Sequence, residues 1–555
     1  MSARHAVTVI GVIAYSFAIY ALLPGIVVAV NDDFAYFRSV LQTLEHARPW
    51  TNDFLEPWAA GQSVLSALIF KATGSFHLAT LGIQTLAAGA AVAGVVALLR
   101  AGLGPVRCLL VAVLLLSCPT VLAKSLEFTS VVLYLPCLLW AIWAAERRRW
   151  AAFFLIWAFA FSNRQSAIAW LALPALDALS RWRIPGSRPI DIARPAAVLV
   201  LSGVMFVMLS GFMNKTQSQT LLTDHLLERV EITKVVHYAL IGWAMMLVSI
   251  GLGSAAIGLG EPNAARPRHL ARRTIVTAIV GSVVVAVLVF RNWMKFEHSG
   301  TLTVGAGYLT ILFLLAAVGW AALRVSVRWP LIAAAAASVV LASLRVPVSD
   351  YYYIDAAILA FFSVVPVRTG APAPAVWRTR AVAAAFAGAI AFVHVRSAIE
   401  LKDFWDRAVA TTLLAEQSLR SGQIGPADLS FAEFGFQGWH LYPYFAENEG
   451  RNDPDIGGFV RYTQPGSVTV ISEPFTGQAE LPARAGRDGD PSVIRSVVVS
   501  SRWFWRQRHT LVRPAAFTPG PDLLVIDPAR YRAMSFPLSD REWRDLMNGA
   551  LHPSR

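Results

Sequence analysis

The feature that most constrains this chain is a succession of apolar segments, most of them long enough to cross a membrane. A helix needs about 20 apolar residues to span a hydrocarbon core of about 30 Å. Only 15% of the 555 residues are charged and the mean hydropathy is +0.52, which excludes an ordinary soluble protein of this size. We therefore predict a polytopic α-helical membrane protein. The thirteen candidate spans are residues 6–30, 76–99, 106–123, 129–145, 150–163, 166–180, 195–213, 235–258, 274–290, 303–323, 329–344, 354–367 and 381–395.

The charges between these segments predict an orientation. With the N-terminus in the cytoplasm, every second loop is rich in arginine, as the positive-inside rule requires, and the C-terminal region lies outside. This alternation needs a turn at the polar group 162–166; if residues 150–180 formed one long helix, the count would be twelve. The net charge of +13 thus indicates arginine-rich cytoplasmic loops, and no nucleic-acid-binding motif is present. The high alanine and arginine content is typical of a GC-rich bacterium, so the bacterial inner membrane is the expected location.

Two domains are expected, a transmembrane domain over residues 1–395 and a soluble extracytoplasmic α/β domain over residues 396–555. The first outer loop, 31–75, contains two predicted interface helices, because apolar residues recur at helical spacing from Phe34 and again from Trp58 to Lys71. Residues 401–420 are predicted to be helical. Short β-like runs follow at 468–471, 493–500 and 523–526.

Two adjacent acids, Asp32 and Asp33, stand in the sequence NDDFAY where the first apolar segment ends. Neighbouring carboxylates raise each other's proton affinity, and one of them can serve as a general base for a lipid-linked substrate at the membrane surface. The alternative is structural: a helix N-terminus favours acids, and Asn31 or Asp32 is a suitable cap for the helix that follows.

The polar break at 162–166 supplies the second candidate, Arg164, because a cation between apolar segments is costly unless it meets an anion. A guanidinium donates hydrogen bonds in a planar fork that suits phosphate. Lys215 and Arg345 are further cations on the predicted outer side. Each of these residues can alternatively anchor its segment by reaching to lipid phosphates at the interface.

A third cluster runs from Asp350 to Asp355 at the start of the twelfth segment, with three tyrosines between the two acids. The tyrosines match an aromatic belt at the membrane surface. Asp355 lies within the apolar run, and an acid at that depth is a functional hypothesis by default. No zinc-binding spacing, phosphate-binding loop or dinucleotide fingerprint stands out.

These features together resemble the GT-C membrane glycosyltransferases. The likeness rests on an inside-to-outside first helix, then Asp32, Asp33 and Tyr36 in an Asp-Asp-x-x-Tyr pattern, then a long outer loop with two interface helices. It is nearest to the group of protein O-mannosyltransferases and lipid A aminoarabinose transferases, in which the pattern is Asp-Glu-x-x-Tyr. Asp33 departs from that pattern and leaves the order of roles open.

The resemblance implies inverting transfer of a sugar from a polyprenyl-phosphate donor to an envelope acceptor, which is a glycan, lipid or protein hydroxyl. It implies that Asp32 is the base, that Asp33 orients the acceptor or the turn, and that no nucleotide sugar takes part; a divalent metal stays an open alternative. Arg164, Lys215 and Arg345 are the expected ligands of the donor phosphate. Residues expected to line the substrate site are Tyr36, Gln165, Asp350, Tyr352 and Asp355.

Two other functions fit a chain with many spans. A transporter or flippase of a lipid-linked sugar would also carry charges within the membrane, although the segments show no evident inverted repeat. A non-catalytic envelope assembly protein would use the outer domain for binding.

Overall fold

The computed structural model describes most of the first 212 residues and several later stretches. The described residues are 3–22, 33–50, 60–74, 76–100, 104–212, 326–344, 350–365, 421–424, 469–475, 493–500 and 506–512, with scattered positions between 235 and 250 and between 395 and 418. The predicted spans 274–290 and 303–323 lie outside these residues, as do nearly all of the predicted span 381–395 and of the predicted helix 401–420.

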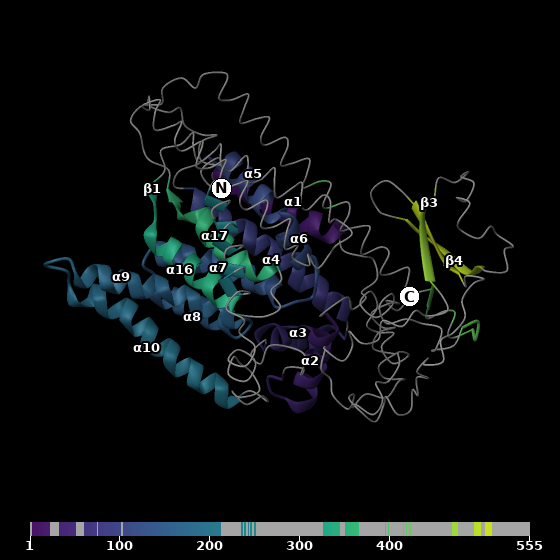
Figure 1. Ribbon diagram of the computed structural model, residues 1–555, viewed down its shortest axis with the longest axis horizontal. Coiled ribbons are helices and arrows are strands. Elements are labelled where there is room, and N and C mark those ends of the chain that lie inside the picture. Colours follow the sequence, from purple (N-terminus) through teal and green to yellow (C-terminus); the bar gives the residue numbers. More distant parts are fainter. Residues whose placement is uncertain are drawn as a thin grey trace, which may run out of the picture. The chain divides into compact units, whose positions relative to one another are not determined.

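The described part of the chain is mainly helical (Figure 1). Its helices are α1 (Ala3–Leu22), α2 (Asp33–His46), α3 (Ala60–Thr73), α4 (Phe76–Leu99), α5 (Pro105–Leu116), α6 (Pro119–Leu126), α7 (Val131–Glu146), α8 (Trp150–Phe161), η1 (Gln165–Leu171), α9 (Ala172–Trp182), α10 (Pro189–Phe212), α16 (Trp329–Ser343), η3 (Asp350–Tyr353) and α17 (Ile354–Ser363). The labels η1 and η3 denote 3₁₀ helices.

Three of the described helices are long and apolar enough to cross a membrane: His5–Leu22 in α1, Leu78–Leu99 in α4 and Pro189–Leu209 in α10. The shorter helices α7, α8, α16 and α17 are also apolar. These helices fall on predicted apolar segments, so the membrane class predicted from the sequence agrees with their length and composition.

The predicted span 106–123 is bent into two helices. α5 and α6 meet at an angle of 76° across a short break. α6 begins at Pro119, which has no backbone N–H to donate and whose ring clashes with the preceding turn of a continuous helix. The apolar composition of this segment concealed the break.

The chain divides into two compact units, which we describe separately. The first contains residues 1–16, 86–125 and 130–398, and the second contains residues 17–85, 126–129 and 399–555. The domain boundary predicted at residue 395 stays a prediction.

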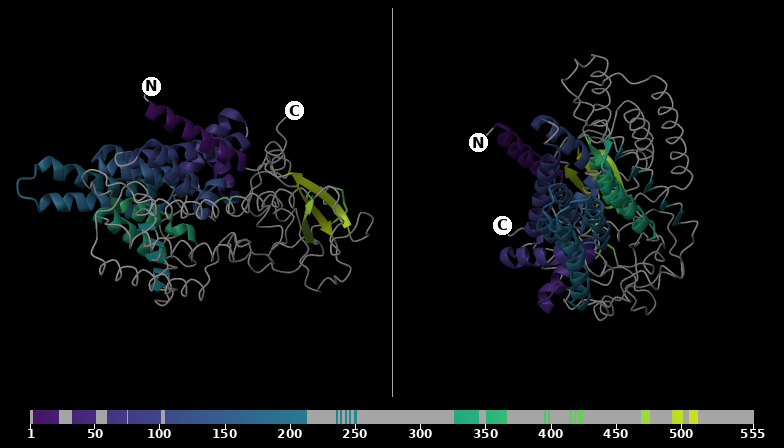
Figure 2. Two further views of the ribbon diagram at one scale, coloured as in Figure 1. Left: turned by 90° about the horizontal axis from the view of Figure 1, so that it is seen from above. Right: turned by 90° about the vertical axis from the view of Figure 1, so that its left-hand side faces the viewer.

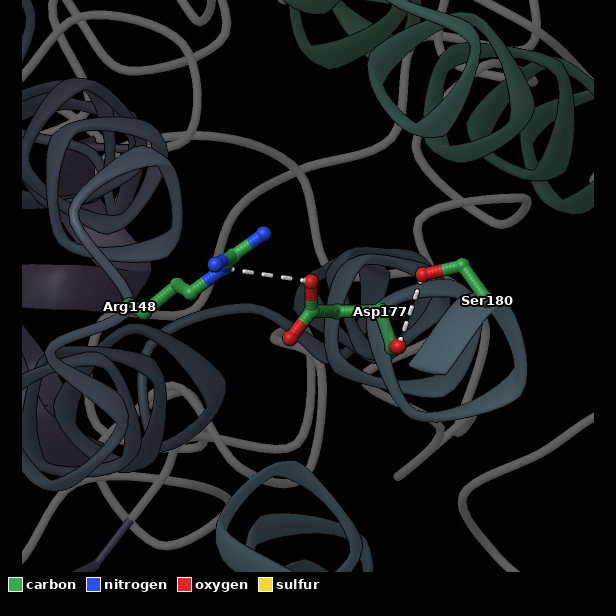
Figure 3. A network of polar contacts seen from close by, with 3 residues as sticks. All are labelled: Arg148, Asp177 and Ser180. Carbon is green, nitrogen blue, oxygen red and sulfur yellow. Dashed lines mark hydrogen bonds and ion pairs between the residues drawn. The ribbon is translucent and has the colours of Figure 1, made fainter. Parts of the chain in front are cut away.

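In the first unit, the polar break at 162–166 is a reversal of the chain between two separate helices. Trp157 of α8 donates to the carbonyl of Ala167 in η1 over 2.9 Å. Farther from the break, Arg148 forms an ion pair of 3.5 Å with Asp177 of α9 (Figure 3). These two contacts are nested around the break, so α8 and the η1–α9 segment form a hairpin. The alternative of one long helix is thereby wrong.

A second hairpin, formed by α16 and α17, packs beside the first. α16 contacts both η1 and α9, and α16 and α17 lie side by side in Figure 1. At its open end, the two-residue strands β1 (Ser326–Val327) and β2 (Val364–Val365) pair antiparallel. There Arg328 forms an ion pair with Glu146, the last residue of α7.

These contacts define two opposite ends of the helix assembly in the first unit. One end, which we call the arginine end, joins Glu146–Arg149 to Arg328 and the middle of α9. The other, the turn end, holds the chain reversal at 162–164 and the start of α17. α9 continues past the arginine end and pairs with α10, as the left view of Figure 2 shows.

The second unit contains a helix pair and a small sheet. α2 packs against α3 and buries Tyr36, Ser39 and Val40. Both helices were predicted, within two residues at each end of α3. The sheet has three antiparallel strands in the order β3 (Thr469–Phe475), β5 (Arg506–Val512) and β4 (Val493–Ser500). β4 matches the predicted run 493–500, whereas β3 overlaps the predicted run 468–471 and continues to Phe475. β5 was not predicted, and the run 523–526 lies outside the described residues.

α4 and α7 approach closely at Gly94. A methyl group built on Gly94 would lie 2.9 Å from Cβ of Leu139, a separation that packed atoms do not tolerate. Trp140 of α7 also donates to the carbonyl of Ala90 over 3.0 Å. Small residues at such a crossing let two membrane helices pack backbone to backbone.

Replacing Gly94 with alanine is therefore expected to push α4 away from α7 and lower the unfolding temperature by several degrees, since overpacking costs about 1–3 kcal/mol. The matched control is Gly82→Ala in the same helix, where nothing lies within 4 Å of the added methyl group. That control should be neutral or slightly stabilising, because alanine favours helix over glycine. Tryptophan-fluorescence melting of the purified protein in detergent measures both; equal effects would contradict the close crossing.

Candidate functional site

The turn end is built on a tightly capped helix end. α8 ends at Phe161, and the side chains of Ser162 and Asn163 both donate to the carbonyl of Phe159, over 2.7 and 2.8 Å. These bonds satisfy a carbonyl that the helix end leaves without an intrahelical partner. The chain then becomes extended at Arg164, with φ −148° and ψ 128°, before η1 begins.

Arg164 is buried in this reversal, with 6% of its surface exposed. Its guanidinium carbon lies 5.5 Å from the ring centre of Tyr134 in α7 and 5.7 Å from that of Tyr352 in η3. Aromatic faces attract a cation through their quadrupole, and the attraction grows when water is excluded. The guanidinium is thus held by rings from two segments that are 218 residues apart in the sequence.

Tyr134 links the arginine to an acid. Its hydroxyl donates to a carboxylate oxygen of Asp355 in α17, and it lies 2.9 Å from the Oγ atom of Ser166. Because the single hydroxyl proton of Tyr134 goes to Asp355, Ser166 must be the donor in the second bond. Trp170 of η1 packs against the same ring at a centroid distance of 4.8 Å. Tyr134 therefore joins α7, η1 and α17 at one point.

Asp355 supplies the charge that Arg164 needs at this depth. It is 4% exposed, and it is linked to Arg164 through Tyr134, whose ring faces the guanidinium and whose hydroxyl donates to the carboxylate. An isolated ion buried in an apolar bundle costs several kcal/mol, whereas two opposite charges with hydrogen-bond partners largely offset that cost. The arrangement can bind an anion at the guanidinium edge, or transfer a proton through the tyrosine and carboxylate.

The structure brings together several of the predicted site residues. Arg164, Tyr352 and Asp355, which the sequence placed in two separate clusters, share one buried network. Gln165 adjoins it in η1, and its buried Nε2 atom has no hydrogen-bond partner within the described part of the chain. Asp350 is the first residue of η3.

The remaining predicted residues fall elsewhere. Tyr36 is buried in α2, and Asp33 is the first residue of that helix. Both belong to the second unit, so no contact between them and the Arg164 network is described. Asp32, Lys215 and Arg345 lie outside the described residues.

Sequence reasoning missed Tyr134 and Trp170 as members of the network. Both stand within apolar segments, where aromatic side chains are common and carry no special signal. The one available signal for Tyr134 was its hydroxyl group, which needs a hydrogen-bond partner when the side chain is buried. Asp177 pairs with Arg148, while Ser180 donates to the backbone carbonyl of Asp177 (Figure 3).

The described residues contain no group of three or more histidine, cysteine, aspartate or glutamate side chains arranged to hold a metal ion. Comparisons with known proteins add no further constraint: no family model, curated protein or solved structure matches this chain. Function is therefore inferred from the residues themselves.

The Arg164 network predicts strong coupling between two substitutions. Arg164→Gln leaves Asp355 as an uncompensated buried acid, and Asp355→Asn leaves an uncompensated cation, so each single variant should lose about 3–5 kcal/mol of stability. The double variant carries neither charge and should lose clearly less than the sum.

Thermal unfolding of the four proteins in detergent measures this coupling. Arg183→Gln is the control, because Arg183 is exposed at the end of α9 and its loss should leave the unfolding temperature unchanged. Additive effects of the two substitutions would show that Arg164 and Asp355 do not depend on each other.

Proposed function

We propose that this chain is a membrane glycosyltransferase that moves a sugar from a polyprenyl-phosphate donor to an acceptor hydroxyl of the cell envelope. The observation that carries the proposal is the pair Asp32 and Asp33 at the junction between the first apolar helix and α2. The packing of α2 on α3 supports it, since the GT-C resemblance implies two helices in this loop. The proposed architecture is GT-C-like, with about thirteen spans and a C-terminal α/β domain.

In the proposed reaction, Asp32 accepts the proton of the acceptor hydroxyl. The hydroxyl oxygen forms a bond to the anomeric carbon of the sugar, and the bond from that carbon to the phosphate oxygen breaks with inversion. The electron pair leaves with the polyprenyl phosphate, whose growing negative charge a cation stabilises. Arg164 is the proposed cation, with Lys215 and Arg345 as further ligands, and Asp33 orients the acceptor.

The buried network supports a role for Arg164 in binding phosphate. Its guanidinium is held by two tyrosine rings, so little conformational entropy remains to be lost when an anion binds. Asp355 keeps the cation tolerable in the bundle before the donor arrives. In this proposal Tyr352 and Gln165 lie on the path of the donor headgroup.

A lipid-linked-sugar transporter is the second candidate, and the buried Arg164–Asp355 pair favours it. Charged pairs within membrane bundles mark transport pathways as well as enzyme sites. A transporter moves its substrate without breaking a bond, so it needs no general base at Asp32. The requirement for a base separates the two functions.

Asp32→Asn should lower the rate of sugar transfer at least about 100-fold, which is the lower end of the effect expected for loss of a general base. Mass spectrometry of envelope glycans and lipids from cells with the wild-type or variant chain measures the product. Asp53→Asn, another acid of the same predicted loop, is the control and should keep the product.

Each possible outcome tests a different part of the proposal. Product made at the normal level by Asp32→Asn would contradict the assignment of the base. An envelope unchanged when the whole chain is deleted would contradict the transferase function itself. If cells that lack the chain accumulate the lipid-linked sugar on the cytoplasmic side of the membrane, the result would support the transporter function.

A further inference from the structure

The turn between α7 and α8 has an unusual residue at its key position. The amide of Arg149 donates to the carbonyl of Ala144, and the amide of Arg148 donates to that of Ala145. This pair of bonds defines a Schellman turn, in which the residue in the left-handed region is usually glycine. Here Arg148 occupies it, with φ 52°. A side chain at this φ costs on the order of 1 kcal/mol. The cost of keeping arginine in place of glycine suggests that residues 147–149 have a function.

The two flanking arginines are held on one aromatic ring. The guanidinium carbons of Arg147 and Arg149 lie 5.1 and 4.9 Å from the ring centre of Trp143. Both arginines are exposed. Two cations that share one indole repel each other, and in a purely solvated turn they would spread apart. Their gathering concentrates positive charge and leaves the N–H edges available to an anion.

Two carboxylates near this turn already have partners. Glu146 pairs with Arg328, and Asp177 pairs with Arg148 (Figure 3). Within the described residues, no ion pair joins Arg147 or Arg149 to an acid. The turn therefore presents two cations that no acid in the described part of the chain neutralises.

Exposed tryptophans place this turn at the depth of lipid headgroups. Trp329, directly after Arg328, is 73% exposed, and Trp182, at the end of α9, is 75% exposed. Tryptophan gathers at the boundary between hydrocarbon and headgroups, because its ring is amphipathic. The phosphate groups of the bilayer lie at this level, within reach of arginines on the same end of the bundle.

We propose that Arg147 and Arg149, held on Trp143, bind the phosphate of an anionic phospholipid headgroup. The site discriminates against zwitterionic lipids, because a choline or ethanolamine cation would meet uncompensated positive charge. The site is separate from the Arg164 network and does not depend on the proposed sugar transfer.

The test uses the full-length protein in detergent, with lipid retention counted by native mass spectrometry. The wild type should retain phosphatidylglycerol several-fold more than phosphatidylcholine. Arg147→Gln/Arg149→Gln should lower phosphatidylglycerol retention about tenfold or more, since each arginine near an anionic surface contributes on the order of fivefold. The matched control, Arg183→Gln/Arg188→Gln, removes two exposed arginines elsewhere and should change retention much less.

Further arms make the result decisive. Trp143→Leu keeps both charges but removes the ring, and should give an intermediate loss. Millimolar inorganic phosphate should not displace the lipid; complete displacement would show a site for free anions and would overturn the proposal. Equal retention of the two lipids, or equal losses in the arginine pair and its control, would also overturn it. If the double variant does not fold, each single glutamine variant should show a partial loss.

Discussion

The burial of Arg164 opposite Asp355 is the constraint on which the turn end depends. A guanidinium that is almost fully buried needs an anion, and that anion comes from α17, far along the sequence. The shared tyrosine then fixes α7, η1 and α17 at one point. The hairpin of α8 and α9 and the hairpin of α16 and α17 are thus joined by polar contacts inside an otherwise apolar assembly.

Charge and periodicity made much of this arrangement predictable. Arg164 and Asp355 stood out because charges inside apolar runs are expensive, and the reversal at 162–166 followed from the arginine alternation. Contacts between distant segments leave no such signal in the sequence. The role of Tyr134, and the contact between the Arg164 cluster and the Asp350–Asp355 cluster, are therefore visible only in the structure. The bend before Pro119 was missed because proline does not always break a helix: Pro136 lies within α7.

The two ends of the first unit use arginine in opposite ways. At the turn end a single guanidinium is buried, enclosed by aromatic rings and matched with an internal acid. At the arginine end several guanidinium groups are exposed, and two of them share the face of one indole. In our proposals the first arrangement binds the donor phosphate within the bundle, and the second binds a lipid headgroup. Arginine suits both roles because its cation is planar and weakly hydrated.

The shortness of α8 has a consequence for the membrane around it. Its 12 residues extend only about 18 Å, against about 30 Å for the hydrocarbon core. A bilayer around such a hairpin would have to thin to match it, at a cost of fractions of a kcal/mol per Å of hydrophobic mismatch. A headgroup could then approach Arg164 at a depth where a full-length helix would present only acyl chains.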